Sequence, residues 1–185
     1  MWKTASARNS TAVERELKRL QRTRRLRRYW GPVLCGAAIC ILLLHFVVRI
    51  HIVSGASMAP SLLPGDVIIC WMPCVEPERG DLVIIHEPTG MEMVKRVVGL
   101  AGDTLEITPE GHVIRNGQLL KEDAAWYGGQ DSSQWETFPL VVPEGTVFCL
   151  GDNRPLSLDS RHRAIGPIPL KEVLGEVIFV LRWQR

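Results

Sequence analysis

The apolar residues of this chain occur first as one long run and then as many short runs separated by turn residues. The long run extends from Pro32 to Val48 without a formal charge, and as a helix it would span roughly 26 Å. Tyr29 and Trp30 precede it, and Arg49 and His51 follow it, where aromatic rings and snorkelling side chains extend a membrane span. We therefore expect a transmembrane anchor over residues 31–50.

A cleaved leader segment is the alternative, because the small residues Gly55-Ala56-Ser57 could follow its apolar core. The basic lead of thirty residues, and the Arg and His between the apolar run and the small residues, argue against cleavage. The arginines before the run place residues 1–30 in the cytosol and everything after Ile50 outside.

After Ile52 the apolar positions occur in short runs rich in Val, Ile and Leu, with Gly, Pro and Asp between them. We expect a compact, mainly β domain over residues 51–185. Asn116-Gly117 predicts a two-residue hairpin turn of type I′, and Leu170–Leu174 predicts a short helix. Residues 121–142 break the pattern and are interpreted as a variable surface excursion. The predicted strands are Asp66–Trp71, Asp81–His86, Glu92–Val98, Asp103–Ile107, His112–Arg115, Gln118–Leu120, Thr146–Leu150 and Glu176–Trp183.

Charge is distributed unevenly and limits the choice of partners. Residues 1–30 contain ten Lys and Arg against two acids, whereas residues 31–185 contain 12 basic and 18 acidic residues. An acidic folded domain argues against nucleic acid as its partner. The stretch Thr11–Tyr29 predicts a basic helix with a capping box at Thr11 and Glu14, and a disordered tail is the alternative; membrane lipid is the expected partner of this segment.

Cysteine and histidine spacing gives no indication of a metal or cofactor. The five histidines are scattered singly and the chain has no pair of Cys-x-x-Cys motifs. Cys70 and Cys74 could form a local disulfide in an oxidising compartment, but free or buried thiols are the simpler interpretation.

Two stretches could together supply a nucleophile and its base. Ser54–Leu62 carries Ser57 nine residues beyond Val48, with Gly55 permitting close backbone approach and Pro60 stiffening the loop. Lys95 lies among Met93, Val94, Val97 and Val98. Burial there would lower the pKa of its amine enough for it to act as a base, although an outward-facing lysine is the alternative from position alone.

A third stretch, Gly151–Arg161, is dense in polar side chains and follows an apolar strand. Such loops often hold a site in place, and a solvated turn with local ion pairs is the alternative.

Four segments, in this order behind an apolar segment, resemble the type I signal peptidases in their short, Gram-positive-like form. They are Ser54–Leu62, Arg79–Ile84, Lys95–Asp103 and Gly151–Gly166, and with the anchor the resemblance covers about residues 33–183. It implies the all-β catalytic fold that signal peptidases share with LexA-like regulators. It also implies a membrane-bound serine endopeptidase that cleaves signal peptides from secreted preproteins after small residues, without a cofactor.

The resemblance also implies a role for each matching residue. Ser57 would be the nucleophile and Lys95 the general base, and Ser157 would hydrogen-bond the Lys95 amine. The Ser57 amide would donate to the oxyanion, and Gly55 stands where many relatives have a second donor, a serine. Asp152, Asp159, Arg96 and Arg161 would brace the site by ion pairs. Ala101 replaces a proline usual in the family.

Other functions on the same scaffold are also considered. A peptidase dedicated to one conjugation or pilus substrate would share the serine and lysine. A non-catalytic assembly factor would be expected to have lost one of them. A LexA-like self-cleaving regulator would need a DNA-binding domain where this chain has an apolar segment.

Overall fold

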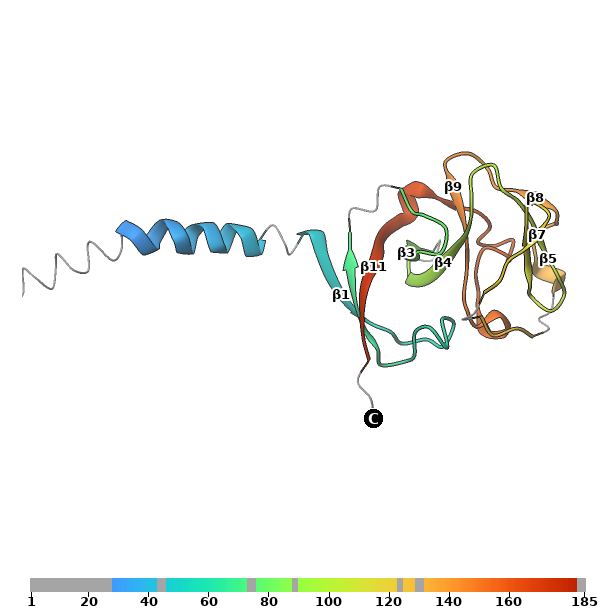
Figure 1. Ribbon diagram of the computed structural model, residues 1–185, viewed down its shortest axis with the longest axis horizontal. Helices are drawn as coiled ribbons and strands as arrows, with labels where there is room; N and C mark the ends of the chain where they lie inside the picture. The colour runs from blue at the N-terminus through green and yellow to red at the C-terminus, as the bar shows by residue number, and fades with distance from the viewer. Residues whose placement is uncertain are drawn as a thin grey trace, which may run out of the picture. The chain divides into compact units, whose positions relative to one another are not determined.

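The computed structural model describes residues 28–42, 46–72, 76–87, 90–122, 125–128 and 132–182. The chain divides into two units, Met1–Phe46 and Val47–Arg185, and each is described by itself. In the first unit residues 28–42 form a helix, drawn in blue in Figure 1. Within the described ranges no helix has the length and apolar character needed to cross a membrane. Most of the basic helix predicted from Thr11 onward lies outside these ranges.

Strand β1, Val48–Ile52, begins where the sequence pattern predicted the end of the apolar helix. It pairs antiparallel with β2, Val67–Trp71, so that Val48 faces Trp71 and Ile52 faces Val67. Residues 48–50, which the predicted anchor includes, are therefore extended and not helical. Arg49 and His51 alternate there with apolar residues, which is the period of a strand.

The larger sheet has seven strands in the order β1-β2-β11-β3-β4-β9-β10. All of its neighbouring strands pair antiparallel. Its remaining strands are β3 Leu82–His86, β4 Glu92–Leu100, β9 Thr146–Leu150, β10 Ile168–Pro169 and β11 Val173–Leu181.

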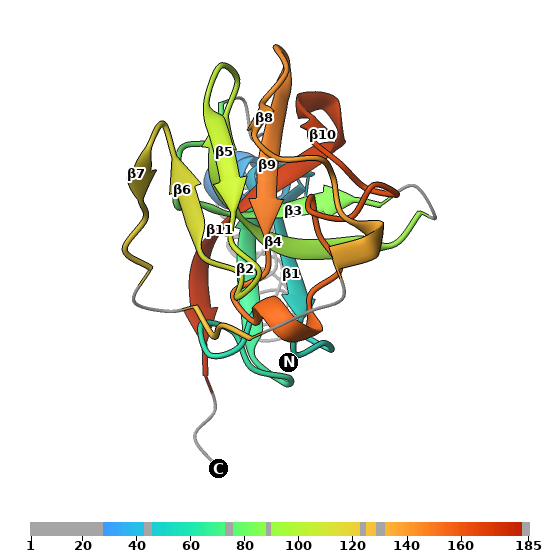
Figure 2. The ribbon, with the colours of Figure 1, turned by 90° about the vertical axis from the view of Figure 1, so that its right-hand side faces the viewer.

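A second sheet has four strands in the order β7-β6-β5-β8 and lies beside β9 in Figure 2. The turn between β6 and β7 has positive φ at both Asn116 and Gly117, which confirms the predicted type I′ hairpin. The strands are β5 Thr104–Ile107, β6 Val113–Arg115, β7 Gln118–Leu119 and β8 Leu140–Val141.

The larger sheet has apolar clusters on its two faces because its central strands are apolar at nearly every position. Strand β3 shows this directly, with Val83, Ile84 and Ile85 all buried. One cluster contains Val83 and Val97, another contains Ile84 and Met58 from the loop after β1, and a third joins the two sheets through Leu105 and Phe148. The predicted mainly β fold is confirmed.

Two local predictions differ from the structure, and two short strands were not predicted. Residues 121–142 are not wholly a surface excursion, since Trp135 and Val142 are buried and β8 pairs with β5. The predicted helix at Leu170–Leu174 is a single 3₁₀ turn, Leu170–Glu172, followed at once by β11. Strands β8 and β10 were not predicted, because two-residue strands produce no periodic pattern. Two further 3₁₀ turns are Ser132–Gln134 and Arg154–Leu156.

Candidate active site

Strand β4 presents Lys95 to the interior of the domain. Lys95 pairs in register with Val83 on β3 and is only 2% exposed. Burial is the main cause that lowers the pKa of its amine below the ordinary 10.5; Asp159 opposes this shift and Arg161 adds to it. The outward-facing alternative for Lys95 is therefore excluded.

The loop after β1 carries Ser57 to the Lys95 amine. Met58 and Leu62 anchor this loop in an apolar cluster, and the amide of Leu62 donates to the carbonyl of Met58 across 2.9 Å. The Ser57 Oγ lies 3.0 Å from the Lys95 Nζ. This is hydrogen-bonding distance, and a neutral amine at that position can accept the hydroxyl proton.

The loop that follows β9 contacts the loop after β1, which is called the nucleophile loop below after the predicted role of Ser57. The Asn153 amide donates to the Ser57 carbonyl at 2.9 Å, and its side-chain amide donates to the Ala56 carbonyl at 3.1 Å. Gly151 packs so closely that a Cβ there would lie 2.5 Å from the Ser57 carbonyl oxygen and 2.1 Å from the Ser157 Oγ. The third polar stretch is therefore a part of the site, and its solvated-turn alternative is excluded.

Ser157 is buried beside this contact, but the expected hydrogen bond to Lys95 is absent. Its Oγ has no hydrogen-bond partner among the described residues, while the Lys95 amine is bonded to Ser57. The side chain instead lies against the Cα of Gly151.

Asp159 and Arg161 form a buried ion pair next to the catalytic candidates. The two side chains are each 1% exposed, and the guanidinium meets the carboxylate at 2.8 and 3.0 Å. Asp159 also accepts from the Gly151 amide at 3.0 Å, and Arg161 lies over the Trp135 ring. The pair thus fixes Gly151, the residue that the nucleophile loop packs against.

Arg96, the neighbour of Lys95, points to the opposite face of β4 and forms a second ion pair. Its guanidinium bonds both oxygens of Asp152 at 2.8 and 2.7 Å. It also donates to the Gly80 carbonyl at 2.7 Å and to the Ser61 hydroxyl at 3.1 Å. One side chain therefore connects the nucleophile loop with the loop after β9.

A groove of about 310 Å³ leads to Ser57. One side is formed by the end of β1 and the loop beyond it, and the other by the start of β4, with Ile68, Ile84 and Met58 buried at its base. The Glu92 carboxylate lies 3.6 Å from His51 and 3.9 Å from Arg49. The groove thus has an apolar base, and Glu92 and His51 are part of its lining.

Gly55 lines this groove, and a Cβ there would meet no atom within 4 Å. Its backbone therefore does not require a glycine, contrary to the expected close approach within the protein.

Sequence reasoning missed several residues of the site. Asn153 and Arg154 hold neighbouring loops through hydrogen bonds to backbone carbonyls, and only the polar density of 151–161 indicated such a role. Ser61 accepts a hydrogen bond from Arg96, and no pattern in its own stretch indicated this. Arg154 is fully buried, donates to the carbonyls of Gly151 and Gly111, and pairs with Glu122. His51 and Glu92 carry no local pattern that predicts their position in the groove.

The thiol of Cys70 is free and buried, and burial raises its pKa to about 11. Its possible disulfide partner, Cys74, lies outside the described residues. Across the described ranges, no group of three His, Cys, Asp or Glu side chains could hold a metal.

Comparison with known proteins identifies the class to which this chain belongs. The family model described as signal peptidase, peptidase S26, matches residues 26–183. Signal peptidase I of Bacillus amyloliquefaciens is 32% identical over 82% of this chain and 83% of its own length. The probable signal peptidase I-1 of a Synechocystis strain is 32% identical over 80% of this chain and 79% of its own.

Among solved structures, a signal peptidase I from Enterococcus faecalis matches at 31% identity with a TM-score of 0.43, covering 55% of this chain and 97% of that one. The sequence matches define the class of this protein, a serine peptidase. More narrowly, the chain belongs to the signal peptidase family, peptidase S26, as the resemblance of its four segments predicted.

Proposed function

We propose that this protein is a membrane-bound endopeptidase that removes signal peptides from secreted preproteins by Ser57 and Lys95. The observation that carries the proposal is the buried Lys95 amine 3.0 Å from the Ser57 hydroxyl, at the end of an apolar groove. Its relatives are named signal peptidase I.

In the first step the neutral Lys95 amine takes the Ser57 proton as the Oγ attacks the scissile carbonyl carbon. The resulting tetrahedral oxyanion would be stabilised by the Ser57 backbone amide, a type of donor whose loss costs about 3 kcal/mol of barrier. Collapse expels the amine of the mature protein, which receives the proton from Lys95. The signal peptide then remains as an ester on the Ser57 Oγ.

In the second step Lys95 takes a proton from water, and the hydroxide attacks the ester carbonyl carbon. The second tetrahedral intermediate releases the signal peptide as a carboxylic acid, which loses its proton to solvent, and the proton on Lys95 returns to the Ser57 oxygen. Lys95 thus acts as base and then acid in each half of the reaction. Its lowered pKa favours the neutral form that begins each step.

The groove supports selection for small side chains near the cut. The preprotein would lie extended along β1, which is an edge strand, and add backbone hydrogen bonds there. Met58 and Ile84 close the space next to Ser57, so alanine-sized residues would fit one and three positions before the cleaved bond. With position 55 occupied by glycine, a substrate backbone can approach without a side chain in the way.

The apolar stretch before β1 supports a membrane anchor, corrected to end at Val47 because β1 starts at Val48. The ten basic residues of 1–30 support a cytoplasmic N-terminus with the β domain outside. Nothing in the fold favours a dedicated substrate or a non-catalytic role over this one.

The proposal predicts that both members of the pair are needed for cleavage. The full chain in detergent would be given a preprotein with an Ala-x-Ala site, and the new N-terminus would be read by mass spectrometry. Lys95→Ala should lower the rate of bond cleavage by roughly 10²–10⁴-fold through loss of the base, and Ser57→Ala should abolish the acyl-enzyme.

Lys171→Ala is the matched control, because this lysine is exposed and lies outside the site; it should cleave at the wild-type rate. Persistent cleavage by folded Ser57→Ala would contradict the assignment of the nucleophile. Failure of the wild type on this substrate, with its fold intact, would contradict general preprotein processing.

A further inference from the structure

A second pocket, of about 330 Å³, lies on the face of β4 opposite to Lys95. Arg96 reaches it because successive side chains of a strand point to opposite faces. The pocket is bounded by β4, by the Arg79-Gly80 turn before β3, and by the chain after β7. The proposed peptidase reaction uses none of this space.

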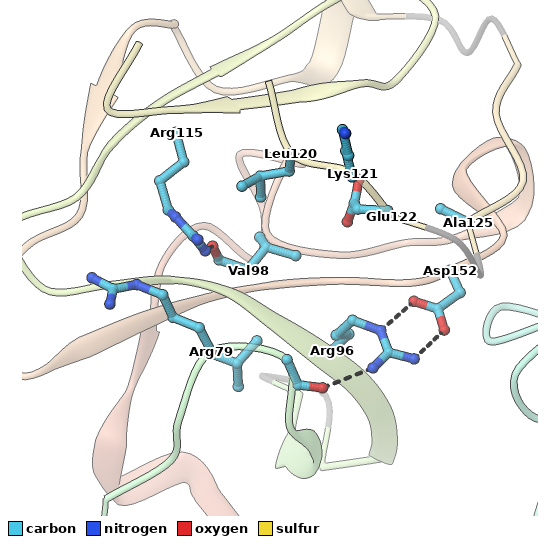
Figure 3. Close-up of a pocket in the computed structure, with 11 residues that line it drawn as sticks. Arg79, Arg96, Val98, Arg115, Leu120, Lys121, Glu122, Ala125 and Asp152 are labelled. Atoms are coloured by element: carbon cyan, nitrogen blue, oxygen red, sulfur yellow. Dashed lines mark hydrogen bonds and ion pairs between the residues drawn. The ribbon is translucent and has the colours of Figure 1, made fainter. Parts of the chain in front are cut away.

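The lining of this pocket is mainly cationic. Its lining includes four basic residues, Arg79, Arg96, Arg115 and Lys121, and two acidic residues, Asp152 and Glu122. Figure 3 shows Arg96 bonded to Asp152 at one end, while Arg115 extends toward Val98 at the other.

The described carboxylates around the pocket are already committed to particular cations. Asp152 pairs with Arg96, and Arg79 pairs with Asp103 outside the lining. Glu122 pairs with the buried Arg154 behind it. Among the described residues, and with these outside partners included, five basic side chains stand against three carboxylates, a surplus of two positive charges.

Arg115 and Lys121 carry this surplus. Arg115 donates through one Nη to the Val98 carbonyl at 2.8 Å, and no described carboxylate pairs with either side chain. The surplus is local, because residues 31–185 are acidic overall. A concave site with one guanidinium and one ammonium that no described carboxylate neutralises favours anion binding, and the planar fork of arginine matches paired oxygens of a tetrahedral anion.

We propose that this pocket binds a phosphate-type oxyanion, either a free phosphate or the phosphodiester headgroup of an anionic lipid. Arg115 and Lys121 would provide the contacts, and the Nη1 group of Arg79 would add a third donor from the opposite rim. Arg96 would remain with Asp152, because that ion pair braces the peptidase site.

Binding would be measured by calorimetry on the full chain in a maltoside detergent, which carries no phosphate. The two probes are inorganic phosphate and short-chain dihexanoyl phosphatidylglycerol, titrated at low salt. A charge-assisted hydrogen bond accounts for roughly tenfold or more in affinity, so Arg115→Gln should weaken binding of the accepted probe at least tenfold. Arg115→Lys, which keeps the charge, should retain part of the affinity.

Lys121→Gln gives a second variant that does not disturb the Arg115–Val98 bond, and it too should weaken binding. Lys171→Gln removes the same charge from a distant surface and should bind as wild type. Binding of phosphate alone would identify a soluble anion, and preference for the lipid probe would identify a headgroup. The proposal is overturned if neither probe binds, or if Arg115→Gln and Lys121→Gln bind as well as Lys171→Gln.

Preprotein cleavage by each variant would be measured in parallel. It should persist in Lys121→Gln, so loss of anion binding is distinguishable from failure of the proposed peptidase function.

Discussion

At the scale of single residues, the environment of Lys95 gives the site its chemical character. Water stabilises an ammonium far better than an apolar interior does, so a lysine that is 2% exposed is stabilised in its neutral form. Burial of Lys95 also lowers the stability of the folded protein at neutral pH. The Lys95 amine is protonated in the unfolded chain, whereas burial disfavours its protonated form in the folded chain.

The pH dependence of this cost can be tested with Lys95→Met. The folded pKa lies below the unfolded value of 10.5, so the unfolded state binds more protons and wild-type stability rises with pH toward 10.5. Methionine does not titrate, so the stability of Lys95→Met lacks this dependence on pH. Denaturant unfolding should show Lys95→Met as the more stable protein at pH 7, with the difference shrinking as pH rises.

A constant difference across that range would contradict the lowered pKa. In the wild type, the rate of preprotein cleavage should increase as pH rises, with a midpoint below 10.5. The reason is that the Lys95 amine can act as a base only in its neutral form.

Gly151 offers a second test at residue scale. A methyl group there would overlap the Ser57 carbonyl and the Ser157 hydroxyl, so Gly151→Ala should displace the nucleophile loop and lower kcat by at least about tenfold, in line with the sensitivity of catalysis to small misplacements. Circular dichroism should show the fold retained.

Gly55→Ala is the matched control for folding, since its methyl group would meet no protein atom. It should unfold at the wild-type temperature, and any effect should appear in KM for the preprotein. Equal activity of Gly151→Ala and wild type would contradict the close packing described above.

The sequence predicted Ser57 and Lys95 as partners through the resemblance of the four segments, since neither residue stood out by its position alone, and the structure brings the two side chains within 3.0 Å. The sequence did not predict the contacts of Asn153, or that Ser157 makes no hydrogen bond to Lys95. Those depend on how two loops about a hundred residues apart meet, and no pattern of neighbouring residues encodes the direction of such a contact.

At the scale of elements, the turn between β4 and β5 is held by Asp103. Its carboxylate accepts from Arg79 at 3.0 and 2.9 Å, from the Leu100 amide at 2.9 Å and from Asn116 at 2.8 Å. It thereby connects the larger sheet to the β6–β7 hairpin. Burial alone would raise the pKa of Asp103, but these donors outweigh it and hold the pKa at about 2.

Asp103→Asn should therefore lower the free energy of unfolding at pH 7 by about 2 kcal/mol, the amount that corresponds to this pKa depression. The wild-type contribution is present above the unfolded pKa of 3.8. It is lost as pH falls through about 2, so the two proteins should converge in acid denaturation. An unchanged difference at pH 2 would contradict the ionised, bonded Asp103.

Most strands could be predicted because their Val, Ile and Leu runs end at Gly, Pro or Asp. Strand β1 was missed because the apolar helix and the strand are continuous in hydropathy, and only the alternation at Arg49 and His51 separates them. Strands β8 and β10 depend on pairing with β5 and β9, which is a tertiary effect.

At the scale of the whole molecule, the two units have separable roles in our proposal. The β unit contains all the residues of the site, while the segment before it would hold that site near membrane-inserted preproteins. Tethering raises the effective concentration of a substrate without any new contact.

A chain that begins at Val47 should then cleave a soluble Ala-x-Ala peptide at close to the full-length rate. Its cleavage of a preprotein inserted in vesicles should fall by about 10²-fold, the scale of a lost tether. A full-length chain with the apolar segment replaced by an unrelated transmembrane helix is the control. If the shortened chain processes vesicle-bound preprotein at an undiminished rate, tethering is not the role of that segment.

The hydrogen bond from Asn153 to Ala56 joins residues 97 positions apart, and this has a consequence for biosynthesis. A nascent chain that has emerged as far as Leu150 already contains both Ser57 and Lys95, yet it lacks Gly151, Asn153 and the Asp159–Arg161 pair. The nucleophile loop then lacks the contacts that Gly151 and Asn153 make with Ala56 and Ser57. Proteolytic competence should consequently appear late during synthesis, so an unfinished copy of the enzyme is harmless to its neighbours.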